Sequence, residues 1–271
     1  MSAFPLRLLL ASLLTTCSLL ASHAEDTNVF GESTASEAAM IGIFYDLKQT
    51  QDHKASNVDA GSYFKVIDEF LSGGWNEAVL NRYYRVSTPL YTTQIYIPSI
   101  SADAAPKAFG AAKTVKPSRW VIHYKAQVAP PEPGTYRFVG SADDVIAVAI
   151  NGKTNLVAPL RNEPGKTFPL TNWNSSSPRG MRAGGGQFVN GDWVEIKKGQ
   201  VIDLDVIVGE RPGGVFSAFL MVEKQGATYQ PGKGGPILPI FQVAPYETPD
   251  PKSEQQGPPF AKGTAPWKSY Q

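Results

Sequence analysis

Two adjacent carboxylates, Asp143 and Asp144, are the residues whose type and spacing point most directly to chemistry in this sequence. They come directly before the run 145–150, in which every residue is apolar. A short, continuous apolar run indicates a central strand buried on both faces, so the pair is expected in a turn at its start. Two explanations remain open. The Asp side chains either accept hydrogen bonds from turn amides and close the preceding hairpin, or they hold a cation between them.

The cation hypothesis requires further ligands, because Ca²⁺ takes six to eight oxygens and two Asp residues cannot fill that shell. The long, polar, Gly-rich segment 161–192 is the concentrated supply of additional oxygens, and segments of this length without regular structure are usually functional or disordered. Its candidate ligands are Asn172, Asn174, Asn190 and Asp192. The predicted metal ligands are Asp143, Asp144, Asn172 and Asp192.

Two tryptophans near that segment have different expected roles. Trp173 lies within the polar segment, where an aromatic ring can stack on a sugar ring. Trp193 opens a predicted strand, and we expect it in the core. The predicted ligand-binding residues are Asp143, Asp144, Trp173 and Asn174.

The sequence gives little support for catalysis, and we predict that the protein is not an enzyme. Of the histidines after residue 24, His53 lies in a polar loop, and His123 is predicted on the exposed face of a strand. No G-x-S-x-G motif is present. Adjacent Asp residues in one turn cannot straddle a glycosidic bond at the ~5–10 Å that its hydrolysis uses. A hydrolase with an unrecognised site remains a minor alternative.

The first 24 residues have the features of a secretory signal peptide. Arg7 precedes an apolar run from Leu8 to Leu20, and small residues around His23 lead to a predicted cleavage site after Ala24. The run is shorter than the about 20 residues needed to span a membrane. We therefore expect an exported protein, periplasmic, extracellular or at the cell surface, with no transmembrane anchor.

The composition of the remaining chain excludes several classes of function. Removing the predicted signal leaves 24 Lys and Arg against 24 Asp and Glu, with no cysteine. Balanced charge gives no basis for attraction to nucleic acid or to an anionic membrane. The missing cysteine excludes disulfides and thiolate metal sites. One domain held together by its apolar core is the expected organisation.

The hydrophobic pattern predicts one convincing helix and a series of strands. Five apolar residues follow Ser62, a predicted N-cap, at spacings of three and four: Tyr63, Val66, Ile67, Phe70 and Leu71. A shorter helix is expected after it. Runs with period two or continuous apolar character then predict strands at 91–98, 119–128, 134–140, 145–150, 193–196, 201–208 and 215–222. Short strands joined by turn sequences predict an all-β protein, an antiparallel β-sandwich with a short helical insertion.

This pattern divides the chain into four parts. They are a signal peptide (1–24), a flexible lead-in (25–39), the sandwich domain (40–226) and a Pro/Gly-rich tail (227–271). The tail holds 9 of the 22 prolines, so we expect it to be extended or disordered.

Three segments in this order resemble the PA14 family. They are "GIFYDL", "WVIHYKAQVAPPEPGTYRFVGSADDVIAVAINGKTNL" and "VEIKKGQVIDLDVIVGERPGGVFSAFLMVE". The middle segment follows the family's core pattern G-x-Y-x-F-x-x-x-S-D-D-G-x-x-L-x-I-N/D-G-K, with Val145 in place of the glycine after the Asp pair. The resemblance covers about residues 42–224, its middle third is the specific part, and the helical segment 62–84 is an insertion.

The resemblance implies a β-sandwich of a kind found in bacterial surface proteins, glycosidase inserts, toxins and fungal adhesins. In the adhesin branch the paired Asp coordinate Ca²⁺, which holds sugar hydroxyls, and that role would fall on Asp143 and Asp144. The expected function is a non-enzymatic binding module at the cell envelope, with a glycan or cell-surface polysaccharide as ligand and Ca²⁺ as cofactor. The alternative is a structural or assembly subunit that docks on an envelope protein through sheet edges or the tail sequence "GGPILPIF".

Overall fold

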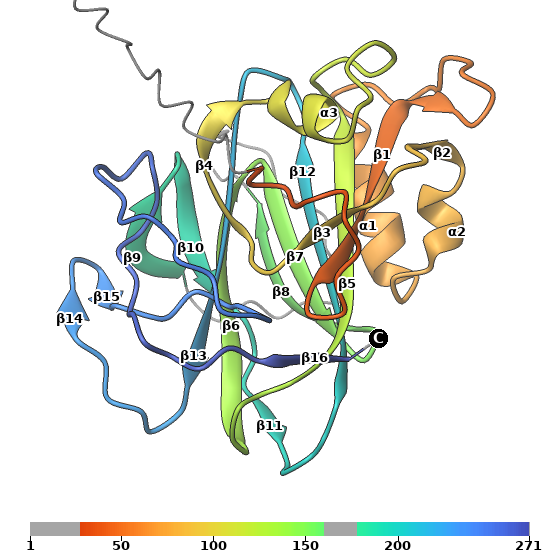
Figure 1. Ribbon diagram of the computed structural model, residues 1–271. Coiled ribbons are helices and arrows are strands. Elements are labelled where there is room, and N and C mark those ends of the chain that lie inside the picture. Colours follow the sequence, from red (N-terminus) through yellow and green to blue (C-terminus); the bar gives the residue numbers. More distant parts are fainter. Residues whose placement is uncertain (1–27, 160–177, 271) are drawn as a thin grey trace, which may run out of the picture.

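A computed structural model gives the structure of residues 28–159 and 178–270 (Figure 1). The predicted signal peptide and most of the polar segment 161–192 lie outside these residues. Among the residues that are described, no helix is both long and apolar enough to cross a membrane.

The first of two antiparallel sheets has eight strands. Its central order is β2-β1-β5-β12-β7-β8, with β3 paired to β1 and β16 paired to β5. The strands are β1 (Met40–Thr50), β2 (Tyr83–Arg85), β3 (Leu90–Thr92), β5 (Trp120–Ala129), β7 (Val145–Ile150), β8 (Lys153–Pro159), β12 (Ile202–Glu210) and β16 (Lys268–Tyr270).

The second sheet has six strands in the order β4-β13-β6-β10-β9, with β11 paired to β6. They are β4 (Tyr96–Ser101), β6 (Gly134–Asp143), β9 (Pro178–Ala183), β10 (Gly186–Asn190), β11 (Val194–Ile196) and β13 (Val215–Lys224), and a small ribbon joins β14 (Pro231–Gly232) to β15 (Gly235–Pro236). Apolar side chains of both sheets form one core between them, among them Phe44, Trp120, Ile146, Phe138 and Leu220. The predicted antiparallel β-sandwich is confirmed.

The outer face of the eight-stranded sheet is covered by helix α1 (Tyr63–Ser72), as Figure 1 shows. Its apolar stripe is the predicted one, and it packs on Ile43, Tyr45 and Ile207 of the sheet. Helix α2 (Glu77–Leu80) follows α1 as a single turn, and α3 (Ala104–Ala108) precedes β5. Because α1 covers one face and the second sheet covers the other, β7 is buried on both faces, as predicted.

The prediction that His123 lies on an exposed strand face is wrong, because α1 and the connection after it cover this face. The side chain is 0% exposed, and its Nε2 lies 2.8 Å from Asp205 Oδ1. The rings of Phe70 and Trp75 flank it. We expected this face of β5 to be in water because its residues alternate with an apolar face, but α1 and the connection after it cover this part of the strand.

Both ends of the described chain pack on the sandwich, which corrects two predictions. Phe30 is buried in the expected flexible lead-in, and the backbone of Glu32 pairs with Tyr91. In the tail, Phe241 and Trp267 lie in the core between the sheets, and β16 extends the eight-stranded sheet. The tail is therefore ordered. Its prolines favour an irregular path, but its scattered apolar residues are enough to anchor it.

Trp193 is not in the core, contrary to our prediction. The residue is 39% exposed, and the guanidinium carbon of Arg137 lies 4.3 Å from its ring centroid. It precedes β11, a three-residue strand that pairs only with β6 and leaves this ring outside the sandwich.

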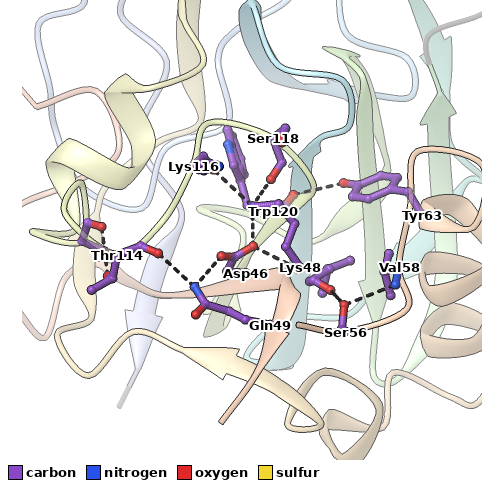
Figure 2. Close-up of polar contacts among 12 residues, drawn as sticks. Asp46, Lys48, Gln49, Ser56, Val58, Tyr63, Thr114, Lys116, Ser118 and Trp120 are labelled. Carbon is purple, nitrogen blue, oxygen red and sulfur yellow. Dashed lines mark hydrogen bonds and ion pairs between the residues drawn. The ribbon is translucent and has the colours of Figure 1, made fainter. Parts of the chain in front are cut away.

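A buried polar cluster ties the segment before β5 to β1 (Figure 2). Asp46 is 1% exposed and forms an ion pair with Lys48, whose ammonium also donates to the carbonyl of Ser118. Gln49 Nε2 donates to Asp46 Oδ2 at 2.7 Å and to the carbonyl of Thr114 at 3.0 Å. These bonds hold the incoming chain against β1 and so fix where β5 begins.

The tail's contribution to stability can be measured with a matched pair of tryptophan substitutions. Trp267→Ala removes a buried ring that contacts Tyr136, Phe138 and Phe241, so we expect a loss of about 3–5 kcal/mol in the free energy of unfolding. Trp193→Ala removes an exposed ring and should cost about 1 kcal/mol or less. Denaturant unfolding of both variants tests this, and equal losses would contradict the described packing of the tail.

Candidate functional site

Asp143 and Asp144 carry the chain from one sheet to the other. Asp143 is the last residue of β6 and pairs with Ser217 of the six-stranded sheet. The Asp144 amide donates to the carbonyl of Gly209 at 3.1 Å, and Val145 begins β7 in the eight-stranded sheet. The peptide bond between the two Asp residues is cis. Val145, where the family pattern has glycine, is a fully buried strand residue outside the positive-φ region.

The carboxylate of Asp144 has a structural task. The residue is 2% exposed, and its Oδ2 accepts the backbone N–H of Arg211 at 2.7 Å. Our first explanation, that the pair caps turn amides, therefore holds in part. The amide belongs to the residue after β12, however, and not to the hairpin that precedes the pair.

Asp143 is the more accessible of the two. Its side chain is partly buried and lies close to Gly185, in the turn between β9 and β10. A Cβ atom built on this glycine would be 3.6 Å from Asp143 Oδ2. Burial, followed by the nearby charge of Asp144, raises the pKa of Asp143 to about 6, and the charge of Arg211 opposes this shift. The carboxylate thus lies in a poorly hydrated position where a cation would stabilise its ionised form.

Glu210 is a third carboxylate at this site, and the sequence analysis missed it. It is 1% exposed; its Oε1 accepts the Gly213 N–H at 2.7 Å, and its Oε2 is buried without a hydrogen bond to any described residue. Burial and then the charge of Asp144 raise the pKa of Glu210 to about 8. The register of β12 with β7, which opposes Gly209 to Val145, brings it here. In the sequence it lies between the predicted strands 201–208 and 215–222, where no local pattern marks it as a site residue.

Arg211 supplies the positive charge described at this site. It is 9% exposed, and its guanidinium carbon lies 5.2 Å from the ring centroid of Phe64. Its charge opposes only in part the rise that burial and Asp144 cause in the pKa of Asp143 and Glu210. Three carboxyl groups therefore share one guanidinium among the described residues; with a pKa of about 8, Glu210 is protonated at neutral pH when no cation is bound, and its ionisation adds a third negative charge. This imbalance favours the binding of a further cation.

The donors present suit a hard cation in type but make up only part of its shell. Carboxylate oxygens of Asp143, Asp144 and Glu210 are ligands that Ca²⁺ prefers, and the buried, unbonded Glu210 Oε2 is an oxygen for which a cation would compensate. Across residues 28–159 and 178–270, no group of three or more His, Cys, Asp and Glu side chains has the arrangement of a metal site. Additional oxygens are needed to complete the coordination.

The structure does not bring Asp192 to the Asp pair. The amide of Gly191 donates to the carbonyl of Phe138, so Asp192 lies beside β6 about five residues, or roughly 17 Å, from Asp143. The Asn190 side chain accepts a hydrogen bond from Arg179. The other predicted ligands, Asn172, Trp173 and Asn174, lie outside the described residues.

Comparisons with known proteins give structural neighbours only. No family model and no curated protein matches the chain. The PA14 sugar-binding domain of an RTX adhesin is 15% identical, covers 76% of this chain and 95% of its own, and has a TM-score of 0.45. The PA14 domain of the MpAFP antifreeze protein is 18% identical over 73% and 88%, with a TM-score of 0.42. Both neighbours are PA14 domains.

A third similar structure is the A domain of epithelial adhesin 6 from Candida glabrata, in complex with Galb1-3GlcNAc. It is 11% identical, covers 76% of this chain and 88% of its own, and has a TM-score of 0.43. The sugar in this complex is the ligand of the adhesin.

The buried acids predict a pH dependence of stability in the absence of metal. The pKa of Glu210 is about 8 in the folded protein against an ordinary 4.5, so between these values the folded state binds its proton more tightly than the unfolded state does. The contribution of Glu210 to stability is therefore full below about pH 4.5 and is lost as the pH rises through about 8. Unfolding in a chelator should show that Glu210→Gln flattens this decline.

Glu195→Gln, an exposed carboxyl on β11, is the matched control and should leave the decline unchanged. If Glu210→Gln and wild type lose stability equally between pH 5 and 8, Glu210 does not titrate as described.

Proposed function

We propose that the protein is a non-catalytic, carbohydrate-binding module that works outside the cytoplasm, at the cell envelope. The observation that carries the proposal is the crossing between the sheets, where three carboxylates share one guanidinium and one buried carboxylate oxygen lacks a partner among the described residues. The predicted signal peptide and the sequence resemblance to PA14 domains support the compartment and the ligand class.

We further propose that Ca²⁺ is the cofactor at this site. Asp143 and Asp144 would hold the ion, and bound Ca²⁺ would supply coordination positions for the hydroxyl groups of a sugar. Within the chain, Asp144 keeps its bond to the Arg211 amide and so fixes the end of β12, while the more accessible Asp143 faces the β9–β10 turn. No hydrolysis is assigned to the pair, because neighbouring carboxylates in one crossing cannot act on opposite sides of a bond.

The alternative is an assembly subunit that docks through sheet edges or its tail, and the tail gives it little support. Of the apolar residues in "GGPILPIF", Ile237 is partly exposed, whereas Leu238, Ile240 and Phe241 are buried in the protein's own cores. They already serve the stability of this domain.

Calcium should stabilise the folded protein through Asp143. A ligand that binds only the folded state at 100 times its Kd adds about 2.7 kcal/mol, which corresponds to a rise of roughly 5–10 °C in Tm for a domain of this size. Asp143→Asn should abolish the rise, whereas Asp192→Asn should retain it because Asp192, which follows β10, lies beside β6 near Phe138 and away from Asp143. Thermal unfolding with calcium and with chelator measures this, and an equal rise in the Asp143→Asn variant would refute the calcium site.

Carbohydrate binding should depend on the same residue. On an array of immobilised glycans we expect wild-type protein and Asp192→Asn to bind in calcium and to be released by chelator. The Asp143→Asn variant should not bind. Glycan binding that persists in chelator and in Asp143→Asn would place the sugar site elsewhere.

A further inference from the structure

A second concave site lies on the outer face of the eight-stranded sheet, beside the covering helices. It is a groove of about 620 Å³, lined among others by Trp75, Glu77, Lys125, Asp203, Asp205 and Tyr270. Its floor comes from β5 and β12, where Asp205 opposes Lys125. Asp205 is four residues along β12 from Gly209, which receives the Asp144 amide, so the groove is roughly 14 Å from the Asp pair.

The acidic side chains of the groove are held in place by hydrogen bonds within the protein. His123 Nε2 lies 2.8 Å from Asp205 Oδ1, and Gln127 Nε2 donates to Asp203 Oδ1 at 2.9 Å. Lys125 forms an ion pair with Glu77 Oε1. In each of the three carboxylates the second oxygen makes no hydrogen bond to a residue in the described ranges. These oxygens are preorganised acceptors for a ligand.

The charge of the groove selects the kind of ligand. Among the lining residues, three carboxylates face the Lys125 ammonium; even with Lys268, whose ammonium lies over the lining ring of Tyr270, the formal charge stays negative. The ion pair with Lys125 holds the pKa of Glu77 below its ordinary value, so this carboxyl is ionised at neutral pH. An anionic ligand is disfavoured here, and a cationic one is attracted.

Aromatic rings complete the lining. Trp75, Tyr91 and Tyr270 contribute to the wall, and the Lys268 ammonium lies 4.7 Å from the ring centroid of Tyr270. Ammonium groups and their aliphatic chains pack favourably on such rings. The volume lies in the range typical of small-molecule sites.

We propose that this groove binds a small aliphatic amine in its ammonium form. Asp203 and Asp205 lie on the same face of β12, about 7 Å apart. Two ammonium groups of one chain reach both carboxylates, while the carbon chain between them lies along the aromatic wall. The ligand class is thus a polyamine or an amino-sugar oligomer, which share this chemistry, and the site is independent of the proposed calcium site.

The test is titration calorimetry of the full chain at low ionic strength with three probes: spermidine, the trimer of glucosamine, and a neutral diol of the length of spermidine. We expect one or both amines to bind and the diol not to bind, and the amine that binds identifies the source. Absence of heat from both amines up to millimolar concentration would overturn the proposal. So would equal binding of the diol.

Point variants test whether the amine binds in this groove. Asp203→Asn removes an exposed carboxylate and leaves the His123 contact with Asp205 intact, and it should weaken amine binding about tenfold and reduce its salt dependence. Asp192→Asn, another exposed acid, and Asp143→Asn should bind amines as wild type does. Thermal unfolding verifies that each variant is folded, and unchanged binding by folded Asp203→Asn would show that the amine binds elsewhere.

Discussion

The transfer of the chain between sheets at Asp143 and Asp144 is the constraint on which the site depends. Consecutive strands β6 and β7 belong to different sheets, so the backbone must leave one ladder and join the other within two residues. Asp144 satisfies both requirements: its amide enters the ladder at Gly209, and its carboxylate accepts the N–H of Arg211, where β12 ends. A carboxylate is thereby fixed in a poorly hydrated position. Burial, and then the charge of Asp144, raise the pKa of Asp143 and Glu210.

The second consequence of the fold concerns the outer face of the sheet. A strand as apolar as β7 cannot have one face in water, and α1 supplies the cover through Tyr63 and Phe70. Beyond the part of the sheet that α1 covers, polar side chains of β5 and β12 line the second groove, and Trp75, in the connection after α1, lines its side. The helices α1 and α2 thus stabilise the sheet and also form part of a second concave surface.

Local sequence patterns predicted the elements well and their long-range relations poorly. The continuous run of β7 and the helical spacing of α1 are local signals, and both were confirmed. The predicted strand 91–98 is divided between β3 and β4, and β9 and β10 lie in the segment 161–192, which was expected to lack regular structure. The proximity of Glu210 to Asp144 depends on the pairing of β12 with β7, which no local pattern specifies. Asp192 was grouped with the Asp pair because the segment 161–192 is rich in oxygen ligands, but the register of β10 with β6 places it beside Phe138, away from Asp143. The tail was misjudged because prolines exclude regular strands without preventing burial of Phe241 and Trp267.

The central claim is that the imbalance of charge at the crossing between the sheets is compensated by a bound cation. The most direct test is a crystal structure obtained in calcium, with anomalous scattering recorded at long wavelength. The account predicts a single strong anomalous peak about 2.3–2.6 Å from carboxylate oxygens of Asp143 and Asp144. The absence of a peak in calcium, with the Arg211 guanidinium bound to both carboxylates, would contradict it.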